Sequence, residues 1–240
     1  MPHELRVGVV DSGYGEHHAA SVDAALGFAL GEDLCVHERA AAPDTLGHGS
    51  AVLALILHAA PGARFCVAQV FHERPVTSAA QIAAAVHWLI AQRVRVINLS
   101  LGVRADRTAL RDACGQAVAA GIVVCASSPA QGASVFPASY PGIVRVTGDA
   151  RCAAHQWSWL DTAQADFGAV VTSRAPYLPN LPGISNERGA PAGASIATAA
   201  LSGHIAARLM LDPEADRDAL LAHLRTHAAF IGAERRSLAS

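Results

Sequence analysis

Stretches of apolar residues alternate with stretches of helical periodicity along most of the chain. Runs such as VRVINL and GIVVCA are apolar nearly throughout, as expected of strands that are covered on both faces of a sheet. The pattern predicts strands at residues 5–10, 34–37, 64–71, 94–99 and 121–126. It predicts helices at residues 48–58, 78–92, 107–120, 195–211 and 214–227. This alternation is typical of parallel strands joined by crossover helices.

The 240 residues contain no internal repeat, low-complexity tract or clear linker. We therefore expect one domain over residues 1–240, of the α/β class, as a three-layer sandwich in which helices cover both faces of a mainly parallel sheet. The longest apolar stretch, residues 51–60, is too short to span a bilayer. The segment from Tyr177 to Ala194, rich in Pro, Gly and Asn, is predicted to be a loop that a substrate could contact.

Three short motifs stand where predicted elements end or begin. VVDSG ends the first strand with Asp11, GHGS opens the first helix with His48, and GASIATA opens a later helix with Ser195. Each alone has an ordinary structural reading as a turn former, a surface histidine or a helix cap. Together they predict a catalytic group, because a weakly nucleophilic serine needs an imidazole to accept its proton and a carboxylate to orient that imidazole.

These motifs, together with the segment VINLSLG from Val96 to Gly102, resemble the four signature blocks of the subtilisin-like serine peptidases. The Asp, His, Ser order is also that of subtilisin. The resemblance implies a subtilisin-like fold and a serine endopeptidase with Asp11, His48 and Ser195 as catalytic residues. It further implies that the substrate backbone lies alongside Ser100, Leu101 and Gly102. These residues form one wall of the pocket for the residue before the cut, and the other wall is formed by Ala126, Ser127 and Ser128.

The oxyanion hole departs from the family pattern. The family places an asparagine side chain there, within a G-N-x-G turn, and the corresponding stretch of this chain runs from Pro129 to Gly132, with Ala130 at the asparagine position. Gln131, one residue further on, is the candidate replacement donor, with the backbone N–H of Ser195 as the second donor. The alternative, that Gln131 is an ordinary residue of a surface turn, stays open.

Metal ions and cofactors are not expected. No acidic residue lies between His48 and Phe71 to supply a carboxylate ligand where the family has a calcium loop. The other histidines show no HExxH or similar zinc spacing. The five cysteines are odd in number and lack CxxC spacing, which argues against a disulfide framework and against a zinc site.

Charge and the N-terminal sequence suggest the compartment and the partners. The net charge is −2 and no Lys/Arg run occurs, so neither nucleic acid nor an anionic membrane is an expected partner. The N-terminus runs directly into a strand pattern, without the basic and apolar regions of a secretory signal. We expect a cytoplasmic enzyme without a propeptide.

Such an enzyme would have to be selective, so we expect it to remove a leader from a peptide or protein substrate, with one dedicated partner. Within the family, the chain most resembles the compact bacterial peptidases that trim the leader of the small crosslinked subunit of quinohemoprotein amine dehydrogenase.

Two other functions compete with this one. The missing asparagine favours a degenerate family member that binds a peptide without cutting it, whereas the complete Asp11, His48 and Ser195 set opposes that reading. An esterase of the α/β-hydrolase kind would need G-x-S-x-G and the order Ser, acid, His. The sequence around Ser195, GASIA, lacks the second glycine, and the order of the three residues differs.

Overall fold

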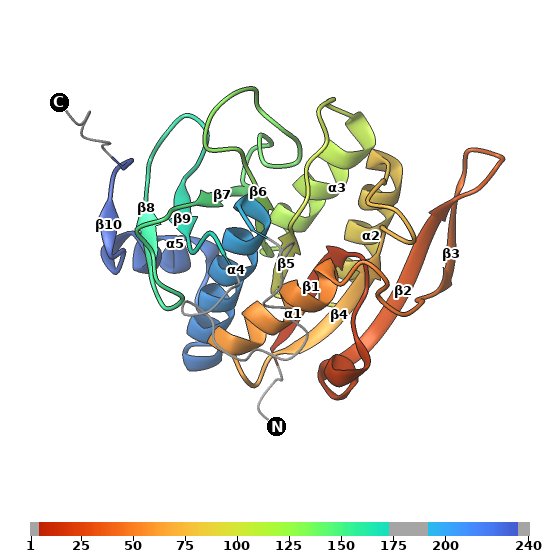
Figure 1. Cartoon of the computed structure of the whole chain (residues 1–240), viewed down its shortest axis with the longest axis horizontal. Helices are drawn as coiled ribbons and strands as arrows, with labels where there is room; N and C mark the ends of the chain where they lie inside the picture. The colour runs from red at the N-terminus through yellow and green to blue at the C-terminus, as the bar shows by residue number, and fades with distance from the viewer. Residues whose placement is uncertain (1–4, 173–191, 235–240) are drawn as a thin grey trace.

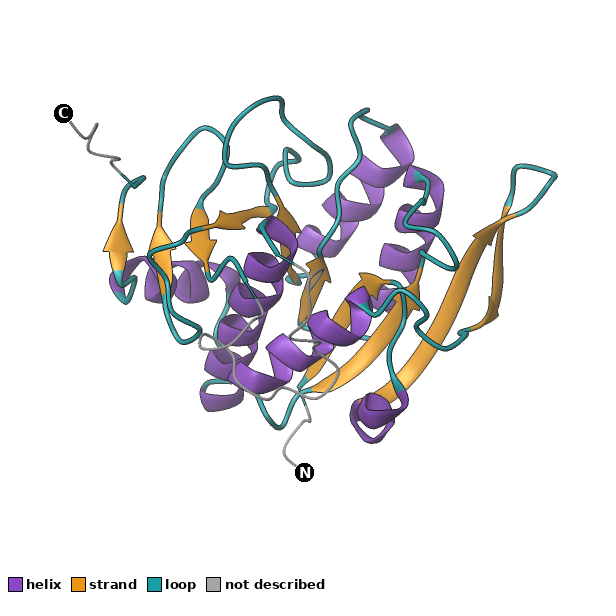
Figure 2. Cartoon of the chain, viewed as in Figure 1, coloured by secondary structure: helices purple, strands orange, loops and turns teal. Residues whose placement is uncertain are grey.

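The computed structural model describes residues 5–172 and 192–234 of the chain. A ten-stranded sheet runs through the molecule with helices on both faces (Figures 1 and 2). In chain order the strands are β1 (Arg6–Asp11), β2 (Val22–Leu30), β3 (Val36–Ala40), β4 (Arg64–Gln69), β5 (Val96–Leu99), β6 (Val123–Ser127), β7 (Val144–Gly148), β8 (Trp157–Trp159), β9 (Phe167–Ala169) and β10 (Phe230–Ile231). Across the sheet their order is β10-β8-β9-β7-β6-β5-β1-β4-β2-β3.

The described helices are α1 (His48–Ala59), α2 (Ala79–Ala91), α3 (Thr108–Ala119), α4 (Ala194–Leu211) and α5 (Arg217–Thr226), with a short 3₁₀ helix, η1 (Glu16–Ser21). Side chains of α1, α4 and α5 form one core cluster on one face of the sheet, and those of α2 and α3 form a second cluster on the other face. This arrangement confirms the predicted α/β class and its mainly parallel sheet. The assignment of all 240 residues to one domain stays a prediction.

The central strands are apolar along most of their length because consecutive side chains enter different cores. Val9 belongs to the cluster around α1 and α4, whereas Val10 belongs to the cluster around α2 and α3. Val96 and Ile97 divide in the same way. Side chains alternate between the two faces of a strand, and a strand that is covered on both faces is therefore apolar at most positions.

The outer strands differ from the sequence prediction. The strand expected at residues 34–37 as one of the parallel set is instead β3, the second arm of an antiparallel hairpin with β2 that projects at one end of the molecule (Figure 1). The pattern missed β2, whose Ala- and Gly-containing sequence has weak strand propensity, although it pairs with β4. It also missed β7 and the two- or three-residue strands β8, β9 and β10, which are too short to show a period.

Among the described helices, α4 alone has the length and hydropathy of a membrane-spanning segment. Its side chains, however, form much of the core shared with α1, including Ile196, Leu201 and Ile205. Gly203 allows the two helices to approach closely, since a Cβ there would lie 2.9 Å from the Cβ of Ala59. In this fold α4 is therefore a core helix.

Candidate active site

The carboxylate of Asp11 and the imidazole of His48 meet at the carboxyl edge of the sheet. Asp11 is the last residue of β1 and is fully buried, while His48 is the first residue of α1. Nδ1 of His48 lies 2.8 Å from Oδ1 and 2.9 Å from Oδ2 of Asp11. An ionised carboxylate can only accept hydrogen bonds, so Nδ1 carries the proton and Nε2 is left as the basic nitrogen. This is the tautomer that a general base requires.

The surroundings strengthen His48 as a base. Burial by itself lowers the pKa of the imidazole, but the hydrogen bond that it donates to Asp11 and the negative charges of Asp11 and Asp44 outweigh it, and the pKa of His48 is raised above its ordinary value. A raised pKa means that the protein stabilises the imidazolium form. Transfer of a proton to Nε2 is therefore favoured here.

Close backbone contact holds the turn after β1 against the start of α1. A Cβ at Gly49 would collide with the carbonyl oxygen of Gly13, whose own φ is +110°. The N–H of Gly49 donates to Oγ of Ser12 at 2.9 Å. From β4, the buried amide of Gln69 donates to the carbonyl oxygen of Ser12 at 2.8 Å. Gly49 of HGS is needed because the two backbones touch, and Gly13 of DSG because its φ is positive.

Asp44, which the sequence analysis did not single out, caps the start of α1. Its carboxylate accepts hydrogen bonds from the hydroxyl of Ser12, the N–H of Gly47, and both the N–H and hydroxyl of Ser50, all within 2.6–2.8 Å. Burial alone would raise the pKa of Asp44, but these hydrogen bonds outweigh it and the pKa is lowered. An aspartate just ahead of a predicted helix is a recognisable cap signal, and it could have identified this residue.

Ser195 lies in the first turn of α4 and is half-buried. Its hydroxyl donates to the carbonyl oxygen of Ser100 at 3.1 Å, and the Ser100 hydroxyl donates back to the carbonyl oxygen of Ser195 at 2.8 Å. Between described residues, no hydrogen bond joins Ser195 to His48. The structure thus pairs Asp11 with His48 and ties Ser195 to Ser100, and the catalytic role of the three predicted residues stays a prediction.

A cleft of about 580 Å³ opens beside His48. The predicted substrate-binding residues Ser100, Leu101 and Gly102 line it together with Asp11 and His48. Apolar residues not anticipated from the sequence complete its walls: Leu46, Phe71, Pro75, Val76 and Val103. A largely apolar cleft with a few polar groups is typical of a ligand site.

The other predicted residues lie apart from this lining. Ala126, Ser127 and Ser128 are buried at the end of β6, where the Ser127 hydroxyl is 3.0 Å from that of Thr198 in α4. Gln131 is exposed in the bend after β6 and makes no hydrogen bond to another described residue. The roles of these four residues remain predictions. Residues 177–191 of the expected substrate-contacting loop lie outside the described residues.

The described residues form no cluster of metal ligands, and most of the thiols are buried. Within residues 5–172 and 192–234, no group of three or more His, Cys, Asp or Glu side chains could hold a metal ion. All five cysteines are free, and only Cys35 is exposed. Burial raises the pKa of Cys66 and Cys152 to about 11 and that of Cys114 and Cys125 to about 12, so these four thiols are protonated and unreactive at neutral pH.

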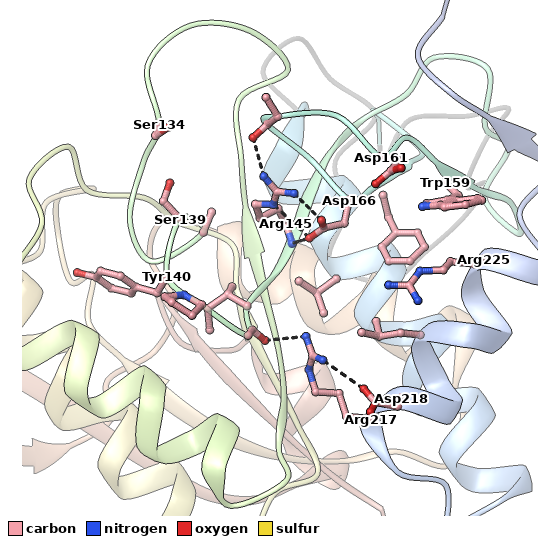
Figure 3. A pocket seen from close by; sticks show the side chains of 18 residues that line it. Ser134, Ser139, Tyr140, Arg145, Trp159, Asp161, Asp166, Arg217, Asp218 and Arg225 are labelled. Carbon is pink, nitrogen blue, oxygen red and sulfur yellow. Dashed lines mark hydrogen bonds and ion pairs between the residues drawn. The ribbon is translucent and has the colours of Figure 1, made fainter.

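A second cavity, of about 650 Å³, lies where β7 and β9 begin, at the sheet edge away from Asp11 (Figure 3). Its charged side chains are largely paired: Arg145 binds Asp166 at 2.6 Å, and Arg217 donates to the carbonyl oxygen of Gly142 at 3.1 Å. None of the predicted site residues lines this cavity. The cleft beside His48 is therefore the candidate active site.

Comparisons with known proteins identify the family of the chain. A family model described as the subtilase family matches residues 3–148. The chain is 37% identical over 135 residues to the subtilisin-like protease het-Q2 of Podospora anserina, covering 52% of this chain but only 35% of that protein. It is 27% identical over 243 residues to subtilisin of Bacillus pumilus, covering 95% of this chain and 85% of that protein. A solved structure, the S41 psychrophilic protease, shares the fold with a TM-score of 0.64 and 18% identity, over 92% of this chain and 82% of that one.

The contact between Gly49 and Gly13 can be tested by substitution. We expect Gly49→Ala to lower the free energy of unfolding by about 1–3 kcal/mol or more, because its Cβ must displace the Gly13 backbone. Urea unfolding followed by circular dichroism measures this. The matched control is Gly115→Ala on the exposed side of α3, where a Cβ meets nothing within 4 Å. It should be stabilising by about 0.5–1 kcal/mol. Equal stability of Gly49→Ala and the parent would contradict the close contact.

Proposed function

This chain belongs to the subtilase family, whose subtilisins are serine endopeptidases, and we propose that it hydrolyses peptide bonds with Ser195 as nucleophile, His48 as general base and Asp11 as the residue that orients the base. The observation that carries the proposal is the contact of His48 Nδ1 with both oxygens of the fully buried Asp11 carboxylate. This contact leaves Nε2 as the acceptor nitrogen of His48, which lines the cleft and has a raised pKa.

The reaction would begin with a change in the hydrogen bond of Ser195. In this structure its hydroxyl donates to the carbonyl oxygen of Ser100, so that hydrogen bond must break before the hydroxyl can donate to Nε2 of His48. As Oγ attacks the substrate carbonyl carbon, its proton passes to Nε2 and the carbonyl π electrons move to oxygen. The imidazolium is stabilised by Asp11. It then returns the proton to the leaving amine as the C–N bond breaks, and water releases the acyl group by the same steps.

The oxyanion would form at the N-terminus of α4. The N–H of Ser195 belongs to the first turn, whose N–H groups have no partner within the helix. The helix dipole adds partial positive charge at the same place. Gln131 is the proposed second donor, supported by its place in the turn after β6 and by its exposed side chain. The Ser195 N–H and the Gln131 amide would then bind the oxyanion from two sides.

The substrate would be an extended peptide. Its backbone would lie along Ser100, Leu101 and Gly102, and its apolar side chains would enter the cleft that Leu46, Phe71 and Val76 help to line. Ala126, Ser127 and Ser128 would form the second wall of the pocket for the residue before the cut. Both walls are uncharged, which favours a neutral side chain at that position.

The free cysteines bear on the compartment in which the peptidase would act, and the compartment bears on its selectivity. All five cysteines are free, which favours a reducing compartment and supports the cytoplasm as the location. A peptidase acting there must spare the other proteins of the cell, so we propose removal of a leader from one peptide or protein partner, as in the leader-trimming members of the family. The competing function is peptide binding without cleavage. It is favoured by Ala130 at the asparagine position and by the Ser195 hydroxyl resting on Ser100.

A fluorophosphonate probe distinguishes a serine peptidase from a protein that binds peptides without cleaving them. We expect the wild type to be labelled at Ser195 and Ser195→Ala to be inert both to the probe and to peptide substrates. Because neutral His48 is the base, kcat/KM should fall as the pH drops through a pKa above the ordinary histidine value. Asp11→Asn should move this acid limb to lower pH and reduce kcat by about 10⁴-fold.

Labelling is measured by intact-protein mass spectrometry, with circular dichroism to show that each variant is folded. If the folded wild type is labelled no better than Ser195→Ala, the chain is not a serine peptidase and the binding function takes its place.

The role of Gln131 predicts a loss in turnover. Gln131→Ala should lower kcat by about 100-fold or more, the size of effect known for loss of an oxyanion donor in a subtilisin, with little change in KM. The neighbouring exposed substitution Ser134→Ala serves as control and should leave kcat unchanged. Steady-state kinetics on a chromogenic peptide measure both. Turnover of Gln131→Ala within about twofold of the parent would exclude Gln131 as the donor.

Selectivity can be measured with a proteome-derived peptide library. Wild type and Ser195→Ala are incubated with the library, and new termini are identified by mass spectrometry. We expect few cut sites that share a neutral residue before the cut and apolar residues further upstream. Frequent cleavage across unrelated sequences would show a general protease and contradict the processing role.

A further inference from the structure

A series of hydrogen bonds between buried side chains links Ser202 in α4 to Asn98 in β5, Asn98 to Ser100, and Ser100 to the backbone of Ser195. From it we infer that Asn98 and Ser202 are positioning residues for Ser195. They fix the orientation of the first turn of α4, and its position along the helix axis, relative to β1, the strand that carries Asp11. The inference rests on the proposed function, because it assigns these residues to the nucleophile named there.

The series of hydrogen bonds is centred on Asn98 in β5. Its Nδ2 donates to Oγ of Ser100 at 2.9 Å, and that hydroxyl donates in turn to the carbonyl oxygen of Ser195 at 2.8 Å. The Ser195 hydroxyl completes the ring by donating to the carbonyl oxygen of Ser100 at 3.1 Å. Since the only proton of the Ser100 hydroxyl is used on Ser195, that hydroxyl needs a donor from the other side, and Asn98 supplies it.

The other end of the Asn98 side chain reaches further along α4. Oδ1 of Asn98 accepts a hydrogen bond from the Ser202 hydroxyl at 3.0 Å. Ser202 follows Ser195 by seven residues, which is close to two helical turns, so the two lie on the same side of α4. The Asn98 amide is therefore linked to α4 at two points along the helix axis: at Ser195 through the Ser100 hydroxyl, and at Ser202 directly. The two contacts add to the packing of α4 against α1 in fixing how the start of α4 is oriented on β5.

The position of Asn98 in the sheet extends this alignment to the acid and the base. Asn98 is the register partner of Val9 in β1, two residues before Asp11. Asn98 and Ser202 are fully buried, and Ser100 is nearly so. Strand pairing and the buried amide thus form one path from the Asp11–His48 pair to the backbone of Ser195. An amide suits this place because it offers a donor and an acceptor on a short, rigid side chain.

Positioning matters because the Ser195 hydroxyl must exchange its hydrogen bond to Ser100 for one to His48 during the reaction. A misplacement of about 1 Å in a reacting group can cost about 100-fold in rate. Loss of the Asn98 contacts would let the first turn of α4 shift, and with it the Oγ of Ser195 and the N–H proposed for the oxyanion hole. The Asp11–His48 pair, held by the turn around Gly13 and Gly49, would stay in place.

The test compares the removal of two buried hydroxyls. Ser202→Ala breaks the contact to Asn98, whereas the control Ser158→Ala removes an equally buried hydroxyl in β8 that does not touch this chain of hydrogen bonds. We expect Ser202→Ala to lower kcat and the rate of fluorophosphonate labelling by about tenfold or more, as a part of the loss that misplacement can cause. Its KM should stay within twofold and the acid limb of its pH profile should not move. Ser158→Ala should keep the parent kcat.

A second variant covers the outcome that Ser202→Ala does not fold. Ser100→Ala interrupts the same chain nearer the surface and should also lower kcat with the acid limb unchanged. A folded Ser202→Ala with parent kcat, or equal losses in Ser202→Ala and Ser158→Ala, would overturn the positioning role while leaving the peptidase intact. Failure of the wild type itself to be labelled would overturn the proposed function and this inference together.

Discussion

The contact between the buried carboxylate of Asp11 and the imidazole of His48 is the interaction on which the rest of the site depends. A carboxylate removed from water is strongly unfavourable unless hydrogen bonds compensate it. Asp11 receives one from the N–H of Ser12 at 2.7 Å and a bidentate contact from His48. The imidazole can approach this closely only because α1 begins directly against the turn that follows β1, where Gly13 and Gly49 lack side chains.

Asp44 makes that approach stable. It binds Ser12 of the turn and Gly47 and Ser50 of the helix start at once, so one carboxylate joins the two segments and caps α1. Its charge adds to that of Asp11 in raising the pKa of His48. Asp11, which contacts the imidazole, and Asp44, which anchors its helix, thus both favour the imidazolium form of His48 beside the cleft.

The proposed nucleophile, Ser195, is held by a separate set of contacts. Ser195 comes from α4, far along the chain, and meets the carboxyl edge of the sheet through Ser100 and Asn98. The two sets are joined by the parallel pairing of β1 and β5, in which Val9 lies opposite Asn98. Paired strands therefore set the position of Ser195 relative to His48, while the Ser195 hydroxyl is held by one hydrogen bond to the carbonyl oxygen of Ser100.

The sequence alone determined the class of the fold and the elements that carry the site. Apolar runs and helical periodicity arise where side chains are buried in a core, and β1, β5, α1 and α4 all contribute buried side chains to the two core clusters. The short motifs around Asp11, His48 and Ser195 could be located for the same reason, since each adjoins such an element. Only the tertiary structure decided the β2–β3 hairpin and strands β8 to β10, because partly exposed or very short strands have no period of their own. It also decided which polar groups form hydrogen bonds with one another. Ser202 and Asn98 are separated by 104 residues, and their hydrogen bond depends on how α4 packs against β5.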